Sequence, residues 1–148
     1  MSRPSGPSPR ATILLVEDDV LVRDVAAQIL EEAGYTVLQA ENAQEAMQLI
    51  ERERSLDLVF SDVRMPGQMD GVGLAKWIRR FHPQLLVVLA SGYVDPKSLL
   101  KAADVDAIMQ KPYAGTDVVR RLDMLLATRR NSAARRKSRA AASADDAG

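Results

Sequence analysis

Residues 12–19 read TILLVEDD, a short apolar run that is followed at once by three carboxylates. A continuous apolar run of this length is typical of a strand that is covered on both faces. Apolar residues then recur at helical spacing as far as Ala33, and Gly34 stands where that helix would end. The stretch therefore predicts a strand–helix unit with an acidic turn between them, in which Asp19 caps the helix.

The same alternation continues outward to Leu126. Further strands are predicted at residues 35–39, 56–61, 85–90 and 107–110, and further helices at about 43–50, 74–81, 96–103 and 118–126. Five β-α units with short connections imply a parallel sheet that is wound on both faces by right-handed crossovers. We therefore expect an α/β fold, a doubly wound five-stranded parallel sheet with five helices, over residues 11–128.

The composition excludes several classes of protein and indicates where the protein is located in the cell. The 148-residue chain is 47% apolar and has no cysteine and one histidine. Disulfide scaffolds, thiolate zinc sites and cysteine nucleophiles are excluded, and we expect neither a Ser-His-Asp triad nor a multi-histidine metal site. No apolar run approaches the ~20 residues that cross a bilayer, and no secretory signal opens the chain. We expect a cytoplasmic protein that has no membrane partner.

The net charge of zero hides an acidic body with basic ends. Residues 129–148 carry six basic and two acidic residues, residues 1–10 carry two basic residues, and residues 11–128 carry 12 basic and 18 acidic ones. Residues 1–10 are rich in Pro, Ser and Gly, and the C-terminal end lacks the large apolar residues that could offset the entropy of folding. We expect a disordered arm at 1–10 and a basic, disordered tail at 129–148. The tail has no interleaved aromatic residues, so we expect no nucleic-acid partner.

Polar side chains stand directly after four of the predicted strands. Glu17 and Asp18 follow the first strand, Asp62 follows the third, Ser91 the fourth and Lys111 the fifth. In doubly wound sheets, functional groups gather beyond the carboxyl ends of the strands. Taken singly, such residues are helix caps, turn formers or solvated groups. Together they predict a functional site at one edge of the sheet.

The chemistry of these side chains favours a hard cation and a phosphoryl group. Three crowded carboxylates repel one another unless a cation neutralises them, and an all-oxygen donor set suits Mg²⁺. The lysine and the serine hydroxyl then supply donors for phosphoryl oxygens, and a carboxylate is the nucleophile that forms an aspartyl phosphate. We therefore predict Mg²⁺-dependent phosphoryl transfer at this edge.

Five short strings also resemble those of a known signalling family. They are LLVEDD (14–19), DLVFSDVRMPG (57–67), MDG (69–71), VVLASGY (87–93) and QKPY (110–113). In this order and spacing they resemble the response regulator receiver domain of two-component and phosphorelay signalling, over about residues 11–128. The resemblance implies a flavodoxin-like receiver fold with strand order 2-1-3-4-5.

The resemblance also implies a role for each site residue. Asp62 is the expected phosphoacceptor, Ser91 supplies the switch hydroxyl, and Lys111 pairs with the phosphoryl oxygens. The expected Mg²⁺ ligands are Asp18, Asp62, the backbone carbonyl of Arg64 and, through a water, Glu17. The bond between Lys111 and Pro112 is expected to be cis.

Three positions depart from the family pattern. The turn after Asp62 is one residue longer than the commonest form. Ile108 stands where the family often has an aromatic switch residue, so phosphorylation cannot be signalled by the swing of an aromatic ring there. Tyr93 is open to two interpretations, a cap over the site and an ordinary surface aromatic residue.

The function that the resemblance implies is that of a stand-alone response regulator receiver. A histidine kinase or histidine phosphotransfer protein donates the phosphoryl group. The signal then passes by phosphorylation-dependent protein contact, through the face formed by residues 96–103, 107–110 and 118–126, or by onward phosphotransfer. A dimer is left open.

Two alternative functions belong to other classes. One is a pseudo-receiver, a binding module that is not phosphorylated. The other is an aspartyl phosphatase, which would usually carry a second Asp where Arg64 stands. We expect no dedicated enzyme, but a phosphoacceptor that assists its own Mg²⁺-dependent phosphorylation and dephosphorylation.

Overall fold

Strands and helices alternate along the chain, as the sequence predicts. The computed structural model describes residues 10–92 and 96–129. The elements are β1 (Thr12–Val16), α1 (Val20–Glu32), β2 (Thr36–Ala40), α2 (Ala43–Arg52), β3 (Leu56–Asp62), α3 (Gly71–Phe81), β4 (Leu86–Ser91), α4 (Pro96–Ala102) and β5 (Ala107–Gln110). A final helix covers residues 115–129. None of the described helices has the length and apolar character needed to cross a membrane.

The predicted arm and tail fall almost entirely outside the described residues. Of the arm, residues 1–10, the structure describes Arg10, and of the tail, residues 129–148, it describes Arg129. Tyr93 also lies outside the described part of the chain.

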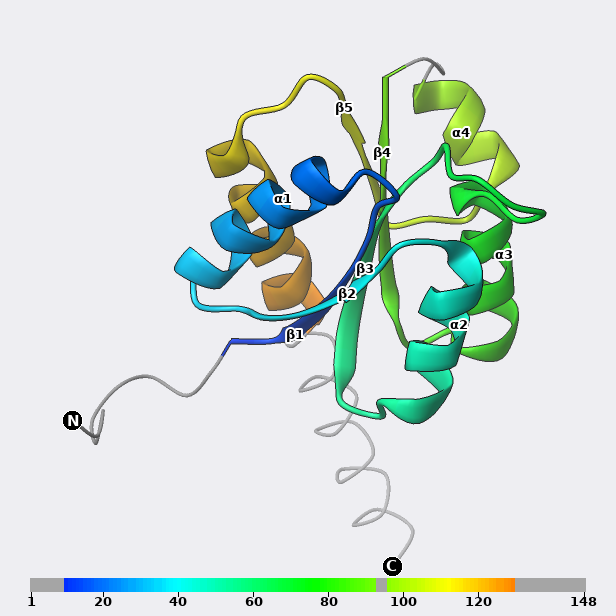
Figure 1. The fold of residues 1–148 in the computed structure, drawn as a ribbon, viewed down its shortest axis with the longest axis horizontal. Coiled ribbons are helices and arrows are strands. Elements are labelled where there is room, and N and C mark those ends of the chain that lie inside the picture. Colours follow the sequence, from blue (N-terminus) through cyan, green and yellow to red (C-terminus); the bar gives the residue numbers. More distant parts are fainter. Residues whose placement is uncertain (1–9, 93–95, 130–148) are drawn as a thin grey trace, which may run out of the picture.

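The five strands form one parallel sheet in the order β2-β1-β3-β4-β5. In Figure 1, α1 and the final helix cover one face of the sheet, and α2, α3 and α4 cover the other. This arrangement confirms the doubly wound α/β fold with five helices and the strand order that the resemblance implies. Each of the helices α1 to α4 connects two parallel strands, which a tight turn cannot do.

Alternate residues of the central strands point into two separate cores. In β1, Leu14 and Val16 lie in the core beneath α2, α3 and α4, whereas Ile13 and Leu15 lie in the core beneath α1 and the final helix. These four side chains are at most 3% exposed. A strand that is buried on both faces needs apolar residues at every position, and this explains the unbroken apolar run of β1.

Side chains and a glycine set the ends of the helices. Asp19 accepts hydrogen bonds from two backbone amides in the first turn of α1, at 3.0 and 3.2 Å. Asn42 accepts one at 2.8 Å in the first turn of α2. Both caps satisfy amides that have no partner within the helix. Gly34 follows α1 with a φ of 100°, a conformation that glycine adopts without strain.

Three strands end one residue later than the sequence predicts: β2 at Ala40, β3 at Asp62 and β4 at Ser91. β3 and β4 continue through Asp62 and Ser91 because the sheet pairs Asp62 with Ala90 and Ser91 with Gln110. The sheet therefore fixes the backbone of both site residues, which a loop would hold less firmly.

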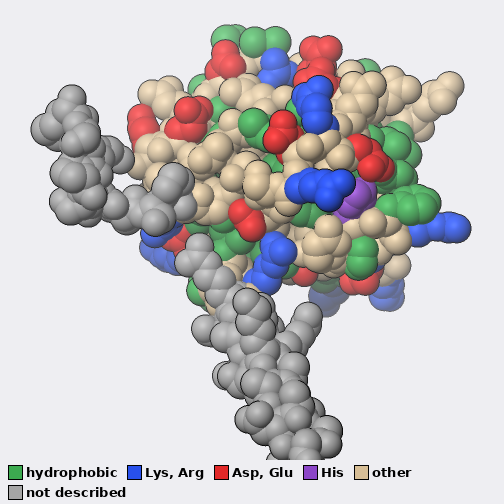
Figure 2. Space-filling model, turned by 90° about the horizontal axis from the view of Figure 1, so that it is seen from below, with side chains coloured by type: hydrophobic (Ala, Val, Ile, Leu, Met, Phe, Trp, Pro, Cys, Tyr) green, Lys and Arg blue, Asp and Glu red, His purple; other side chains and the backbone are tan. Residues whose placement is uncertain are grey.

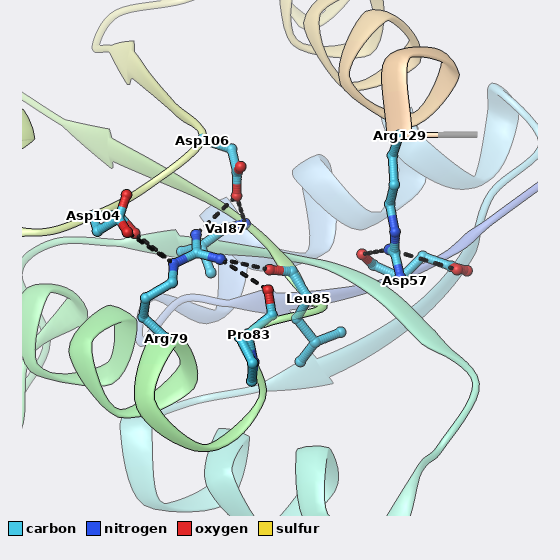
Figure 3. Close-up of polar contacts among 8 residues, drawn as sticks. All are labelled: Asp57, Arg79, Pro83, Leu85, Val87, Asp104, Asp106 and Arg129. Carbon is cyan, nitrogen blue, oxygen red and sulfur yellow. Dashed lines mark hydrogen bonds and ion pairs between the residues drawn. The ribbon is translucent and has the colours of Figure 1, made fainter. Parts of the chain in front are cut away.

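At the edge of the sheet opposite Asp62 and Ser91, Arg79 in the last turn of α3 is the centre of a hydrogen-bond network (Figure 3). Its guanidinium donates to the carbonyls of Pro83, Leu85 and Asp104 and to the carboxylate of Asp106, at 2.9 to 3.3 Å. Asp106 also accepts from the amide of Val87 at 2.7 Å. Figure 2 shows the molecule from this side, where acidic and basic side chains are interspersed. The network ties α3 to the beginning of β4.

A second polar cluster ties the first described residue to the final helix. Arg10 lies 2.6 Å from a carboxylate oxygen of Asp123, and the hydroxyl of Tyr35 donates to the same carboxylate. Tyr35 is 5% exposed. Its burial, together with the hydrogen bond and charge of Asp123, raises the pKa of Tyr35 to about 12, against the opposing effect of Arg10.

This cluster should make stability depend on pH at the alkaline end. The unfolded tyrosine titrates near pH 10, so the neutral phenol contributes fully below about pH 10, and its contribution is lost as the pH rises to about 12. Over that window we expect the free energy of unfolding to fall by about 2–3 kcal/mol more in the wild type than in Tyr35→Phe. Urea unfolding at a series of pH values measures both. Parallel pH profiles would contradict the expectation.

Candidate functional site

Four strand ends meet at the upper edge of the sheet in Figure 1. Glu17 directly follows β1, Asp62 and Ser91 are the last residues of β3 and β4, and Lys111 directly follows β5. These strands are consecutive neighbours in the order β1-β3-β4-β5. The order of the strands therefore brings residues that lie far apart in the sequence to one edge, as predicted.

Three carboxylates form the centre of the site. Carboxylate oxygens of Glu17, Asp18 and Asp62 all lie within 4.8 Å of one another. Glu17 is buried, Asp62 is partly buried and Asp18 is exposed, so the cluster opens to solvent on one side. Mg²⁺ prefers such hard oxygen donors and keeps several of its waters. These residues fit the cation that the sequence predicts.

Hydrogen bonds hold the first and the last residue of the acidic turn after β1, Glu17 and Asp19. The amide of Glu17 donates to the carbonyl of Ala40 on β2 at 3.0 Å. The amide of Asp19 donates to Oε2 of Glu17 at 3.1 Å, while the Asp19 side chain caps α1. The Glu17 carboxylate is therefore turned inward, toward the ends of the neighbouring strands.

Lys111 supplies the positive charge of the site. Its Nζ lies 3.0 Å from Oδ1 of Asp62 and 3.7 Å from Oε1 of Glu17. Its backbone amide donates to the carbonyl of Ser91 at 2.8 Å, which joins the end of β5 to the end of β4. The bond between Lys111 and Pro112 is cis, as the resemblance implies.

The pKa values of two groups reflect this crowding. The pKa of Glu17 lies above its usual value, chiefly because burial raises it. The Asp18 and Asp62 carboxylates also raise this pKa, whereas the hydrogen bond from the Asp19 amide and the charge of Lys111 lower it. Burial alone lowers the pKa of Lys111, but the hydrogen bond and charge of Asp62 and the charge of Glu17 outweigh burial and raise it. Lys111 is thus held in its charged form.

The other predicted residues lie around the same edge. Ser91 is 4% exposed, and Arg64 lies two residues past Asp62, where its side chain is exposed. Ile108 in β5 is partly buried and packs against the core beneath α4. The structure thus places Ser91 at the end of β4, the strand next to β3 that ends in Asp62, while the roles of Ser91 and Arg64 in phosphoryl binding stay predictions.

Two residues that support the site were not predicted. A Cβ atom at Gly71, the first residue of α3, would lie 2.2 Å from the carbonyl oxygen of Asp62. Only glycine lets the helix begin so close to the end of β3. Arg23 in α1 donates to the carbonyl of Glu17 at 2.8 Å. The MDG string contains Gly71, but no sequence signal reveals either contact.

Comparison with known proteins agrees with this geometry. Residues 13–123 match the family model described as the response regulator receiver domain. The chain is 41% identical over 86 residues to the sensor kinase CckA of Brucella abortus, covering 57% of this chain and 9% of that protein. It is 34% identical over 119 residues to the phosphate regulon transcriptional regulatory protein PhoB of Pseudomonas aeruginosa, covering 78% of this chain and 51% of PhoB.

Solved structures show the same similarity. A CheY-like receiver domain protein from Methanospirillum hungatei has a TM-score of 0.75 and 29% identity, over 82% of this chain and 98% of that one. NtrX from Brucella abortus has a TM-score of 0.78 and 29% identity, over 86% of this chain and 29% of NtrX. The chain spans about half or less of the curated relatives named above. From residue 13 to residue 123, the chain belongs to the response regulator receiver domain family.

Proposed function

We propose that this chain is a receiver that accepts a phosphoryl group on Asp62 from a histidine kinase or a histidine phosphotransfer protein. The observation that carries the proposal is the contact between Lys111 and Asp62, inside a cluster of three carboxylates at one edge of the sheet. This arrangement offers a nucleophile, a fixed positive charge and a set of oxygen ligands within one small space. Phosphoryl transfer requires little more than these parts.

In the proposed reaction, a carboxylate oxygen of Asp62 attacks the phosphorus of the donor's phosphohistidine. The new O–P bond forms as the P–N bond breaks, and the donor imidazole leaves with the bonding electron pair. Lys111, already 3.0 Å from Asp62, pairs with an oxygen of the incoming phosphoryl group. The hydroxyl of Ser91 donates to another of those oxygens.

Glu17, Asp18 and Asp62, with the backbone carbonyl of Arg64, are the proposed Mg²⁺ ligands, with Glu17 acting through a water. When bound, Mg²⁺ supplies the positive charge that offsets the charge of the phosphoryl oxygens. Glu17 and Asp18 then have a shared role, because they hold the cation beside the nucleophile. The same groups would assist hydrolysis of the aspartyl phosphate, so we propose no dedicated enzymatic activity.

Phosphorylation is proposed to signal through protein contact or onward phosphotransfer in the cytoplasm. Movement of Ser91 and Lys111 toward the phosphoryl group would shift the ends of β4 and β5, which their backbone hydrogen bond joins. The surface formed by α4, β5 and the final helix includes one of these two strands. This surface is the proposed contact face for a downstream protein. Ile108 lies in β5, so this shift must pass through packing and not through an aromatic swing.

A small phosphodonor tests the proposal without a cognate kinase. Incubation of the chain with acetyl phosphate should add one phosphoryl group to its intact mass, and only when Mg²⁺ is present. If no adduct forms, and beryllofluoride with Mg²⁺ also fails to bind, the proposal is wrong. The chain would then be a pseudo-receiver that keeps the fold without the chemistry.

The phosphodonor protein is proposed to contact α1. Because the phosphoryl group passes directly between two side chains, the donor must lie against the edge that carries Asp62. Next to this edge, α1 exposes Val20, Leu21, Val22 and Val25, which are between 42% and 76% exposed. An apolar groove of about 360 Å³ runs beside them toward Tyr113 and Val118. Exposed apolar patches of this kind mark interaction surfaces.

Leu21→Asp should therefore separate the two kinds of donor. Leu21 is 76% exposed, so the change should leave the fold intact while it opposes an apolar contact. The kinase for this test is the histidine kinase that phosphorylates the wild-type chain fastest. With this kinase, we expect Leu21→Asp to be phosphorylated about tenfold more slowly or slower still. The rate with acetyl phosphate should be unchanged. Met124→Asp, at an exposed position of the final helix, is the matched control. Equal kinase rates for both variants would contradict the proposed docking on α1.

A further inference from the structure

Arg23, the fourth residue of α1, joins three segments of the chain beside the carboxylate cluster. Its Nη1 donates to the carbonyl of Glu17 at 2.8 Å, and its Nε donates to the side-chain oxygen of Gln39 on β2 at 3.2 Å. Its backbone amide donates to the carbonyl of Asp19 at 2.9 Å. One residue of α1 therefore holds both the beginning and the end of the acidic turn.

These contacts act on the peptide that leads into Asp18. The amide of Glu17 is already bonded to Ala40 on β2, so the Arg23 bond to the Glu17 carbonyl fixes the other side of the same residue. Hydrogen bonds on both sides of Glu17 therefore restrain the peptide between Glu17 and Asp18. The orientation of this peptide places the exposed Asp18 carboxylate against those of Glu17 and Asp62.

We propose that Arg23 is a positioning residue for Mg²⁺ at the proposed phosphorylation site. The inference rests on the proposed function and adds a residue from outside the predicted ligand set. Arg23 touches neither the cation nor the phosphoryl group in this account. It acts through the backbone of Glu17, so that the ligands are already arranged when the cation arrives and little ordering remains to oppose binding.

An effect of the Arg23 charge on the site would require its guanidinium to face one of the carboxylates. The guanidinium of Arg23 donates instead to the carbonyl oxygen of Glu17 and to the side-chain oxygen of Gln39. Geometry is therefore the proposed means of action. A lysine, which lacks the planar fork that reaches two acceptors, should replace Arg23 only in part.

The test is an NMR titration of the full chain with Mg²⁺, which follows the amide signals of residues at the site and requires no phosphorylation. Arg23→Ala should bind Mg²⁺ about tenfold more weakly than the wild type, the size of effect found when supporting contacts of metal ligands are removed. Arg23→Lys and Gln39→Ala should each lie between the two. Thermal unfolding without Mg²⁺ is measured for every variant, to separate positioning from stability.

Arg79→Ala is the matched control, because it makes the same change at the opposite edge of the sheet and removes more hydrogen bonds (Figure 3). It should lower the melting temperature at least as much as Arg23→Ala and leave Mg²⁺ affinity unchanged. Two outcomes overturn the role of Arg23: a wild-type affinity in Arg23→Ala, or an equal loss of affinity in Arg79→Ala. A wild-type chain that binds no Mg²⁺ at the carboxylates overturns the proposed function as well.

Discussion

Asp62→Asn is expected to abolish the uptake of a phosphoryl group from acetyl phosphate. An aspartyl phosphate is a mixed anhydride of a carboxylate and a phosphate. The side-chain amide of asparagine is a poor nucleophile and cannot form it. The substitution also removes one oxygen ligand from the cluster and the charge that faces Lys111 at 3.0 Å. Intact mass after incubation with acetyl phosphate and Mg²⁺ should show one added phosphoryl group in the wild type and none in the variant.

Asp19→Asn is the control for this experiment. It makes the same chemical change one residue from Asp18, and asparagine caps a helix as well as aspartate does. Since Asp19 serves as the cap of α1 and lies outside the carboxylate cluster, uptake should persist. Uptake that is lost in both variants would point to a general need for negative charge, and uptake that persists in Asp62→Asn would remove Asp62 as the acceptor.

Gly71→Ala is expected to produce the largest loss of stability among single methyl additions at this edge. The new Cβ would lie 2.2 Å from the Asp62 carbonyl oxygen and 2.8 Å from the Cα of Val63. Both atoms belong to the backbone, so either α3 or the end of β3 must move. We expect a loss of about 3 kcal/mol in the free energy of unfolding, or roughly 10 °C in melting temperature.

The same displacement should reach the chemistry, because the carbonyl oxygen that the new Cβ meets belongs to Asp62, the proposed phosphoacceptor. We expect Gly71→Ala to slow phosphorylation by acetyl phosphate even at temperatures where the chain is fully folded. Gly92→Ala is the matched control for stability, since its Cβ would meet Lys111 at an ordinary 3.6 Å. Comparable melting temperatures for the two variants would contradict the close approach of α3 to β3.

Periodicity and strand ends account for most of what the sequence predicts. Unbroken apolar runs such as residues 12–16 and 86–90 identify strands that are buried on both faces, and a chain of such units has few ways to fold other than a doubly wound sheet. The rule that function gathers at the carboxyl ends of these strands then selects Glu17, Asp62 and Lys111. The structure brings the charged atoms of all three within 4.8 Å of one another.

What the sequence could not predict depends on contacts between distant segments. Arg23 on an exposed helix has the same local signature as any solvated arginine, and its two acceptors lie in other elements. The close approach at Gly71 depends on where α3 crosses β3. The last residues of β3 and β4 are polar, so the apolar pattern ends before them, whereas the sheet pairing continues through them.

Phosphorylation of Asp62 is tested most directly by locating the phosphoryl group on the wild-type chain. After incubation with acetyl phosphate and Mg²⁺, borohydride reduces an aspartyl phosphate to homoserine, and peptide mass spectrometry identifies the converted residue. We expect conversion at Asp62 alone, dependent on Mg²⁺. Conversion at Glu17 or Asp18 in its place, or stable phosphorylation on a hydroxyl such as that of Ser91, would contradict this expectation.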